Sequence, residues 1–160
     1  MLKALFPGSF DPPTLGHLNI LERASRIYDE IEVVVAVNPK KEYTFTAEER
    51  YTMMVQLVEE LPNVTVETWD KLIVSYADKV GARIILRGVR ALADFEYEFE
   101  LSMLNRGLKP TVETIFMPTD PQYFVLRSTS IKELARLGGD ISSMVPGFVA
   151  TALRERLGVA

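Results

Sequence analysis

The sequence predicts an α/β fold, in which helices cover both faces of a parallel sheet. Short runs of apolar and β-branched residues alternate along the chain with longer stretches whose apolar residues recur every three or four positions. The run Ile31–Val37 is apolar almost throughout, which is typical of a strand covered on both sides. The chain has 160 residues, 48% of them hydrophobic, which suffices for one continuous core. We therefore expect a single Rossmann-like, doubly wound domain over residues 1–160, with a five-stranded parallel sheet.

The order of elements follows from the same alternation. Apolar and β-branched runs predict strands over residues 2–6, 31–37, 64–66, 84–86 and 114–117. Helical spacing predicts helices over residues 14–28, 46–60, 72–80, 91–104, 130–138 and 146–157. The sequence contains no internal repeat, low-complexity segment or linker that would divide it.

Several helix starts carry capping signals. Thr14 is expected as an N-cap residue, which would place His17 at the third helical position. The segments 46–49 and 130–133 both match the capping-box pattern, in which a Ser or Thr is followed three residues later by Glu. Pro146 suits the first turn of the last helix.

Charged and hydroxyl residues gather in the loops that follow the predicted strands. In a doubly wound sheet, ligands bind beyond the carboxyl ends of the strands, where the strand order reverses. The loops after the first, second, fourth and fifth strands should therefore share one rim. Four clusters fall there: Ser9–His17, Lys40–Lys41, Arg87–Arg90 and Arg127–Ser130.

His17 is the single histidine of the chain and lies at a predicted helix N-terminus. Helix N-termini attract anions, above all phosphate, and an imidazole adds a donor for charge that develops on a phosphoryl oxygen. Each cluster also has a structural interpretation: His17 and Arg127–Ser130 as helix caps, Asp11 as a turn residue, and the cations as solvated surface charge. The convergence of four such loops on one edge favours a phosphate site.

Composition excludes several other classes of function. A net charge of −4 argues against non-specific nucleic-acid binding, which needs a basic face. No apolar run approaches the roughly 20 residues of a membrane span, and residues 1–6 predict a strand rather than an export signal, so we expect a cytoplasmic protein. Without cysteine and with one histidine, a thiolate or His-rich metal site is excluded. The sequence also lacks the P-loop motif and the Gly-x-Gly-x-x-Gly dinucleotide-binding motif. Among the reactions considered, phosphoryl or nucleotidyl transfer is the one that suits the residues present.

Three motifs resemble those of a known family. Gly8–Pro12 followed by Thr14–His17 is similar to the signature of the nucleotidylyltransferase superfamily, in which a Thr/His-x-Gly-His element binds ATP. The segments Phe45–Arg50 and Leu86–Glu98 resemble the phosphopantetheine adenylyltransferase family. The resemblance spans essentially the whole chain, as one nucleotidyltransferase domain, and Arg87–Glu98 is its most specific part.

The resemblance implies a reaction and a set of partners. ATP and 4′-phosphopantetheine would give dephospho-coenzyme A and pyrophosphate, with Mg²⁺ as cofactor. It also implies a homohexamer and feedback inhibition by coenzyme A. His17 would stabilise the transition state, with Lys41 and Arg90 beside it.

The resemblance further implies two groups of binding residues. The acceptor would contact Ser9, Lys41, Ile73 and Arg87. ATP would contact Ser9, Phe10, His17, Gly88, Val89, Arg90, Glu98, Phe124, Val125, Leu126, Arg127, Ser128, Thr129 and Ser130.

One segment departs from the family pattern. Three consecutive serines are usual there, whereas this chain has Arg127–Ser130. Together with 138–141 and Val145–Pro146, this end also resembles nicotinate mononucleotide adenylyltransferase, which is an alternative activity. Arg87–Glu98 has no expected counterpart in that relative. A nucleotide-binding module without catalysis, and a structural protein with chance loop charges, are further alternatives.

Overall fold

The computed structural model describes residues 1–159, and within them five strands form one parallel sheet in the order β3-β2-β1-β4-β5. The first strand, β1, pairs in parallel with β2 on one side and with β4 on the other, and β4 pairs in parallel with β5. The direction in which the chain adds strands to the sheet therefore reverses between β1 and β4. The predicted fold class and sheet are thereby confirmed. The strands are β1 (Lys3–Gly8), β2 (Glu30–Ala36), β3 (Val64–Trp69), β4 (Ile84–Val89) and β5 (Glu113–Pro118).

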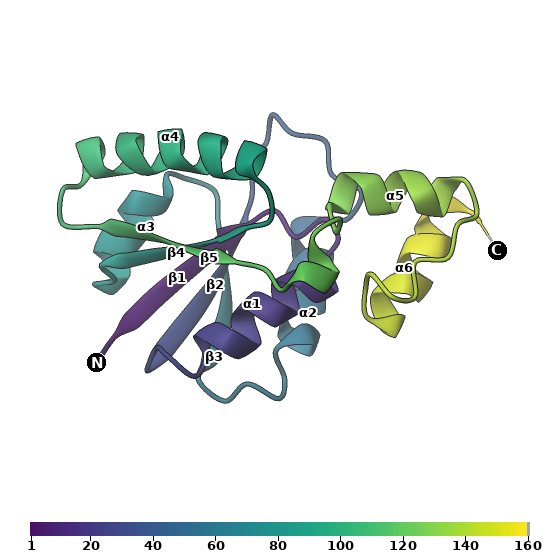
Figure 1. Cartoon of the computed structure of the whole chain (residues 1–160), viewed down its shortest axis with the longest axis horizontal. Helices are drawn as coiled ribbons and strands as arrows, with labels where there is room; N and C mark the ends of the chain where they lie inside the picture. Colours follow the sequence, from purple (N-terminus) through teal and green to yellow (C-terminus); the bar gives the residue numbers. More distant parts are fainter. Residues whose placement is uncertain (160) are drawn as a thin grey trace.

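Helices cover both faces of this sheet (Figure 1). Helices α1 and α2 lie on one face, α3 and α4 lie on the other, and α5 and α6 stand beyond the carboxyl ends of the strands. The bounds are α1 (Leu15–Ala24), α2 (Ala47–Leu57), α3 (Ile73–Val80), α4 (Leu92–Leu108), α5 (Ser128–Arg136) and α6 (Gly147–Leu157), with a short 3₁₀ helix over Pro121–Tyr123. None of these helices, in the part of the chain described, is long and apolar enough to cross a membrane.

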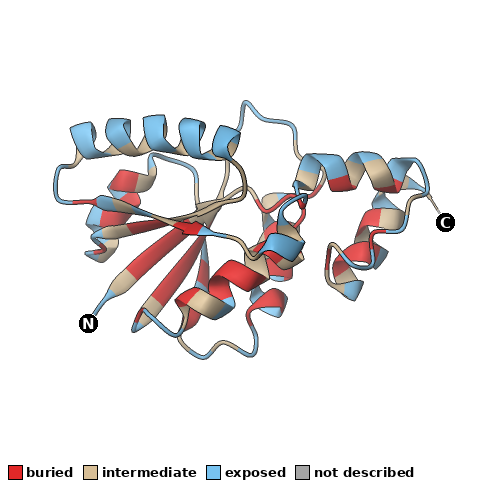
Figure 2. Cartoon of the chain, viewed as in Figure 1, coloured by how far each residue is buried: buried red, intermediate tan, exposed pale blue. Residues whose placement is uncertain are grey.

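The side chains of β1 divide between two cores. Ala4 and Phe6 pack with residues of α1 and α2, whereas Leu5 packs with residues of α3 on the opposite face. This division follows from the two-residue period of a strand. A third cluster joins α5 and α6 to Phe45 and Met53, and so attaches both helices to the loop after β2. The buried strands are visible in Figure 2.

Two of the expected helix caps are confirmed. Thr14 caps α1 and accepts a hydrogen bond from the His17 N–H, and Thr46 forms a capping box with Glu49 at α2. The capping box expected at Ser130 is wrong, because α5 begins at Ser128 and its N-cap residue, Arg127, makes no side-chain cap bond. Pro146 is the N-cap residue of α6 and so lies just before its first turn.

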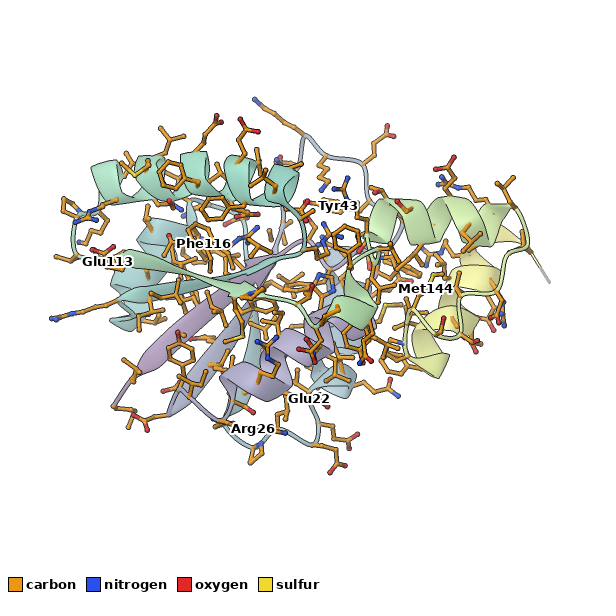
Figure 3. The ribbon with its side chains drawn as sticks, in the orientation of Figure 1. Glu22, Arg26, Tyr43, Glu113, Phe116 and Met144 are labelled. Atoms are coloured by element: carbon orange, nitrogen blue, oxygen red, sulfur yellow. The ribbon has the colours of Figure 1, made fainter. Side chains whose placement is uncertain are left out.

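Helix α4 is the most exposed helix on the sheet (Figure 2). Each of its 17 residues is at least partly exposed. Phe95 packs its ring against Phe116 of β5 at a centroid distance of 5.1 Å, and Figure 3 shows Phe116 beneath the helix. The outer side of α4 carries large apolar side chains, among them Leu92, Leu104 and Leu108, which are each more than 60% exposed.

Candidate active site

A cavity of about 350 Å³ lies where the strand order reverses, between the ends of β1 and β4 and the start of α1. This is the place at which ligands bind in doubly wound sheets. Eleven residues singled out from the sequence line it: Ser9, Phe10, His17, Arg87, Gly88, Arg90, Glu98, Leu126, Arg127, Ser128 and Thr129.

Hydrogen bonds to Thr14 fix the orientation of the His17 ring. The Thr14 N–H donates to His17 Nδ1 at 3.0 Å, and the His17 N–H donates to Thr14 Oγ1 at 3.3 Å. Because Nδ1 is an acceptor, the proton of the neutral ring is carried by Nε2. Burial lowers the pKa of His17 to about 4, and the positive charges of Arg90 and Arg87 contribute to this. At neutral pH, His17 therefore offers an uncharged N–H donor to the cavity.

Two aromatic rings hold the imidazole from the side of the sheet. The Phe10 ring meets it edge-on at a centroid distance of 5.0 Å, and the Phe6 ring lies 6.4 Å away. Phe10 reaches this position with a φ of 48°, in the left-handed region. A Cβ on Gly8 would approach the Phe10 ring to 2.8 Å, so any other residue there would push this buried ring out of its position. The Gly-Ser-Phe sequence thus shapes the wall beside His17.

Each cavity arginine at the end of β4 is paired with a carboxylate of α4. Arg87 donates to Glu98 through Nε at 2.6 Å and also through a second nitrogen, and it donates further to the Pro7 carbonyl. Arg90 donates to Asp94 at 3.0 Å and to the Leu126 carbonyl at 2.8 Å. These bonds orient both guanidinium groups on one side of the cavity.

Lys41 reaches the same edge from the loop after β2. Its Nζ donates to Ser9 Oγ at 3.1 Å, and its side chain lines a neighbouring hollow together with Tyr43 and Arg50. Arg50 is buried and donates to the carbonyls of Ser9 and Ala36 at 2.7 and 2.9 Å. Lys41 is therefore positioned beside Ser9, and Arg50 supports the backbone beneath both.

A smaller hollow of about 120 Å³ adjoins the main cavity and is lined by Ile73. Arg87 and Glu98 line both spaces, so they form the wall between them. Six residues expected from the sequence lie outside the lining of the main cavity as described. Lys41 and Ile73 line the two neighbouring hollows, whereas Val89, Phe124, Val125 and Ser130 line none of the three. The side chains of Phe124 and Val125 are mostly exposed.

Sequence reasoning missed Asp94 and underestimated Thr14. Asp94 lines the cavity and contacts both Arg90 and Arg127, the latter at 3.3 Å. Asp94 lies in the first turn of α4, four residues after Arg90, which precedes the helix, and this short separation of opposite charges was a usable signal for an ion pair. Thr14 was expected only as a cap, and its control of the His17 tautomer depends on the position of the Thr14 N–H against Nδ1, which the spacing alone does not determine.

Comparison with known proteins places the chain in a family. The sequence profile of the cytidylyltransferase-like family matches residues 5–134. The phosphopantetheine adenylyltransferase of Dictyoglomus thermophilum is 45% identical over 159 residues, covering 99% of this chain and 97% of that protein. That of Symbiobacterium thermophilum is 46% identical over 156 residues, covering 98% and 96%. The chain belongs to the phosphopantetheine adenylyltransferase family.

Members of this family are nucleotidyltransferases, and the chain is accordingly an enzyme of that class. A solved structure from Vibrio parahaemolyticus, titled a putative nicotinate-nucleotide adenylyltransferase, superposes with a TM-score of 0.68. It is 20% identical and covers 98% of this chain and 95% of its own. That likeness supports the fold alone. The phosphopantetheine adenylyltransferase family, by contrast, matches along nearly the whole sequence.

Proposed function

We propose that this chain transfers the adenylyl group of ATP to 4′-phosphopantetheine, giving dephospho-coenzyme A and pyrophosphate. The names of the relatives at 44–46% identity support this choice of acceptor. The observation that carries the chemistry is the neutral His17, held in the wall of a cavity beside Arg87 and Arg90. Such a donor suits a phosphoryl group on which negative charge develops.

The reaction proceeds by one in-line displacement. A phosphate oxygen of the acceptor forms a bond to the α-phosphorus of ATP, the bond to the bridging β-phosphate oxygen breaks, and pyrophosphate leaves. The acceptor phosphate has a second pKa of about 6 and is mostly dianionic at neutral pH, so no strong base is needed. His17 Nε2–H donates to an oxygen on the α-phosphorus and stays protonated throughout. Its contribution is alignment and charge stabilisation.

The acceptor phosphate binds between Lys41, Ser9 and Arg87. Lys41 Nζ and Ser9 Oγ already lie within hydrogen-bond distance of each other at this edge. Arg87 donates three hydrogen bonds to described residues, two to Glu98 and one to the Pro7 carbonyl. A guanidinium group has five N–H groups, so two of them can bind an anion. The pantetheine arm then enters the adjoining hollow that Ile73 lines.

ATP occupies the remainder of the cavity, with its phosphates between His17 and Arg90. The start of α5 offers the Ser128 and Thr129 side chains and the N-terminal amides of a helix, which favour phosphate. Gly88 and Glu98 line another part of the wall, and residues 126–129 close the nucleotide end.

Mg²⁺ enters with the substrate, as its complex with the phosphates of ATP. The donor set fits this arrangement, because the cavity carboxylates Asp94 and Glu98 are each bonded to an arginine. Mg²⁺ in nucleotide sites is commonly held by phosphates and water with few protein ligands. The ion would draw charge from the leaving pyrophosphate.

The same proposal covers assembly, inhibition and location. The exposed apolar side of α4 supports a homo-oligomer, with six chains by resemblance to the family. Coenzyme A contains both the pantetheine arm and an adenylyl group, so it fits both parts of the site and acts as a feedback inhibitor. We place the enzyme in the cytoplasm.

A pyrophosphate-release assay tests the acceptor directly. ATP and Mg²⁺ are supplied with 4′-phosphopantetheine, with nicotinate mononucleotide, or with no acceptor. We expect release only with 4′-phosphopantetheine, accompanied by dephospho-coenzyme A in the mass spectrum of the products. Release with nicotinate mononucleotide instead would refute the proposed acceptor, and no release with either would refute the proposed activity.

A further inference from the structure

Asp11 is a buried carboxylate that the proposed reaction does not use. It is 5% exposed and follows Ser9 and Phe10 in the loop after β1. Its Oδ1 accepts from the Phe45 N–H at 2.9 Å, and its Oδ2 accepts from the Thr44 N–H at 2.9 Å. The same Oδ2 accepts from Lys132 Nζ at 3.0 Å. One side chain therefore joins three segments that are far apart in the sequence.

Each of the three segments carries groups of the site. Thr44 and Phe45 lie at the end of the loop that contains Lys41. Within this loop, the Lys41 N–H donates a hydrogen bond to the Asn38 carbonyl and so forms a turn. Lys132 lies on α5, whose first residues Ser128 and Thr129 line the cavity.

A second bond reinforces the link between α5 and the loop after β1, because Ser128 Oγ donates to the Pro12 carbonyl at 2.8 Å. Lys132 has no contact with the 38–45 loop among the described hydrogen bonds and ion pairs except through Asp11. Asp11 is therefore the polar link between Lys132 and that loop, beside the apolar cluster that Ile131 of α5 shares with Phe45.

We propose that Asp11, with Lys132, is a positioning residue that holds the acceptor-phosphate loop and the nucleotide-side helix α5 in one fixed geometry. The proposal rests on the proposed function, since it assigns Lys41 to the acceptor and the start of α5 to ATP. Loss of the lysine leaves the buried carboxylate without the cation that is bonded to it, and a shift of the Asp11 side chain towards water then releases Thr44 and Phe45 as well. Buried charges of this kind depend on their partners, so one deletion disturbs the whole junction.

The test is steady-state kinetics of Lys132→Met on the full chain, with each substrate varied while the other is saturating. We expect KM for ATP and KM for 4′-phosphopantetheine to rise together, each by about fivefold or more, as the loss of a charge-assisted hydrogen bond predicts. The value of kcat should fall by less than either KM rises, because His17 keeps its bonds to Thr14. Lys132→Arg, which keeps the charge, should restore most of both KM values.

Lys3→Met is the matched control. Lys3 Nζ is likewise bonded to carboxylates, at 2.8 Å from Glu30 and 2.9 Å from Glu32, but it lies at the amino end of β1, away from the cavity. Its substitution should lower the melting temperature and leave both KM values unchanged. This separates a loss of general stability from a loss of positioning.

The outcomes are distinct. A rise in KM for ATP alone, with KM for 4′-phosphopantetheine unchanged in Lys132→Met, would overturn the proposed link to the acceptor loop. If Lys132→Met does not fold, Asp11→Asn with Lys132 intact provides the second variant and should raise the same two KM values. An inactive wild-type enzyme would instead count against the proposed function.

Discussion

His17 has two roles at the scale of the single residue. It completes the N-terminal cap of α1 through Nδ1, and it forms part of the cavity wall. The first role fixes the tautomer that the second requires, because a ring nitrogen that accepts a bond cannot also carry the proton. The cap interpretation and the catalytic interpretation of this histidine are therefore compatible.

Replacement of His17 by alanine should act on turnover. We expect kcat to fall by about 10²–10³-fold, the usual cost of losing one donor to a developing oxyanion. The Kd for ATP should change by less than about threefold, since the arginines and α5 still hold the phosphates. Steady-state kinetics with calorimetry of ATP binding measure both, and a variant that retains most of its turnover would contradict the role.

The low pKa of His17 also affects stability. In the unfolded chain the ring has its ordinary pKa of about 6.5, whereas in the folded chain burial lowers the pKa to about 4. Between these values the unfolded state binds the extra proton, so the contribution of His17 to stability is complete above pH 6.5 and declines as the pH falls. Relative to His17→Ala, the wild type should lose on the order of 1 kcal/mol of unfolding free energy per pH unit there.

Urea unfolding of both proteins at pH 7, 6 and 5 provides the comparison. Parallel curves for the wild type and the variant would show that the histidine is not buried in the neutral form.

Some of the site could be predicted from single residues and some could not. The Thr14–His17 cap is a local pattern, and it appears in the structure as expected. The pairing of Arg87 with Glu98 depends on how β4 and α4 cross, which no local spacing determines. The exposed positions of Phe124 and Val125 likewise follow from the course of a loop.

At the scale of the element, α5 shows how tertiary contacts override a local signal. The Ser130–Glu133 spacing predicts a start at residue 130, yet the helix begins at Ser128. Ser128 Oγ instead bonds the Pro12 carbonyl, and Lys132 bonds Asp11. Contacts with the loop after β1 thus set the start of the helix. As a result, the first turn of α5 contains Ser128 and Thr129, which both line the cavity.

At the scale of the whole molecule, the position of the site follows from the sheet. Alternating strands and helices with right-handed crossovers required the loops after β1, β2, β4 and β5 to meet at one edge. The packing of α5 and α6 beyond that edge was not predictable, because it depends on a buried cluster that joins Ile131 and Val149 to Phe45, which lies far away in the sequence.

The apolar side of α4 makes a prediction about assembly. We expect the wild type to sediment as an oligomer and Leu104→Glu to dissociate it, since Leu104 is 64% exposed in the single chain and a buried unpaired charge is costly. Leu137→Glu is the matched control, because Leu137 is 81% exposed at the end of α5. Dissociation by both substitutions, or by neither, would contradict an interface on α4.

The neutral state of His17 in the cavity wall can be tested directly on the ring itself, because His17 is the single histidine of the chain. NMR of the untagged protein labelled with ¹⁵N in the histidine ring reports the tautomer and charge of His17 without assignment. At pH 7 we expect a neutral ring with its proton on Nε2, and we expect the resonance of that nitrogen to shift when α,β-methylene-ATP saturates the protein. A charged ring, or a resonance that saturating nucleotide leaves unmoved, would contradict the central claim.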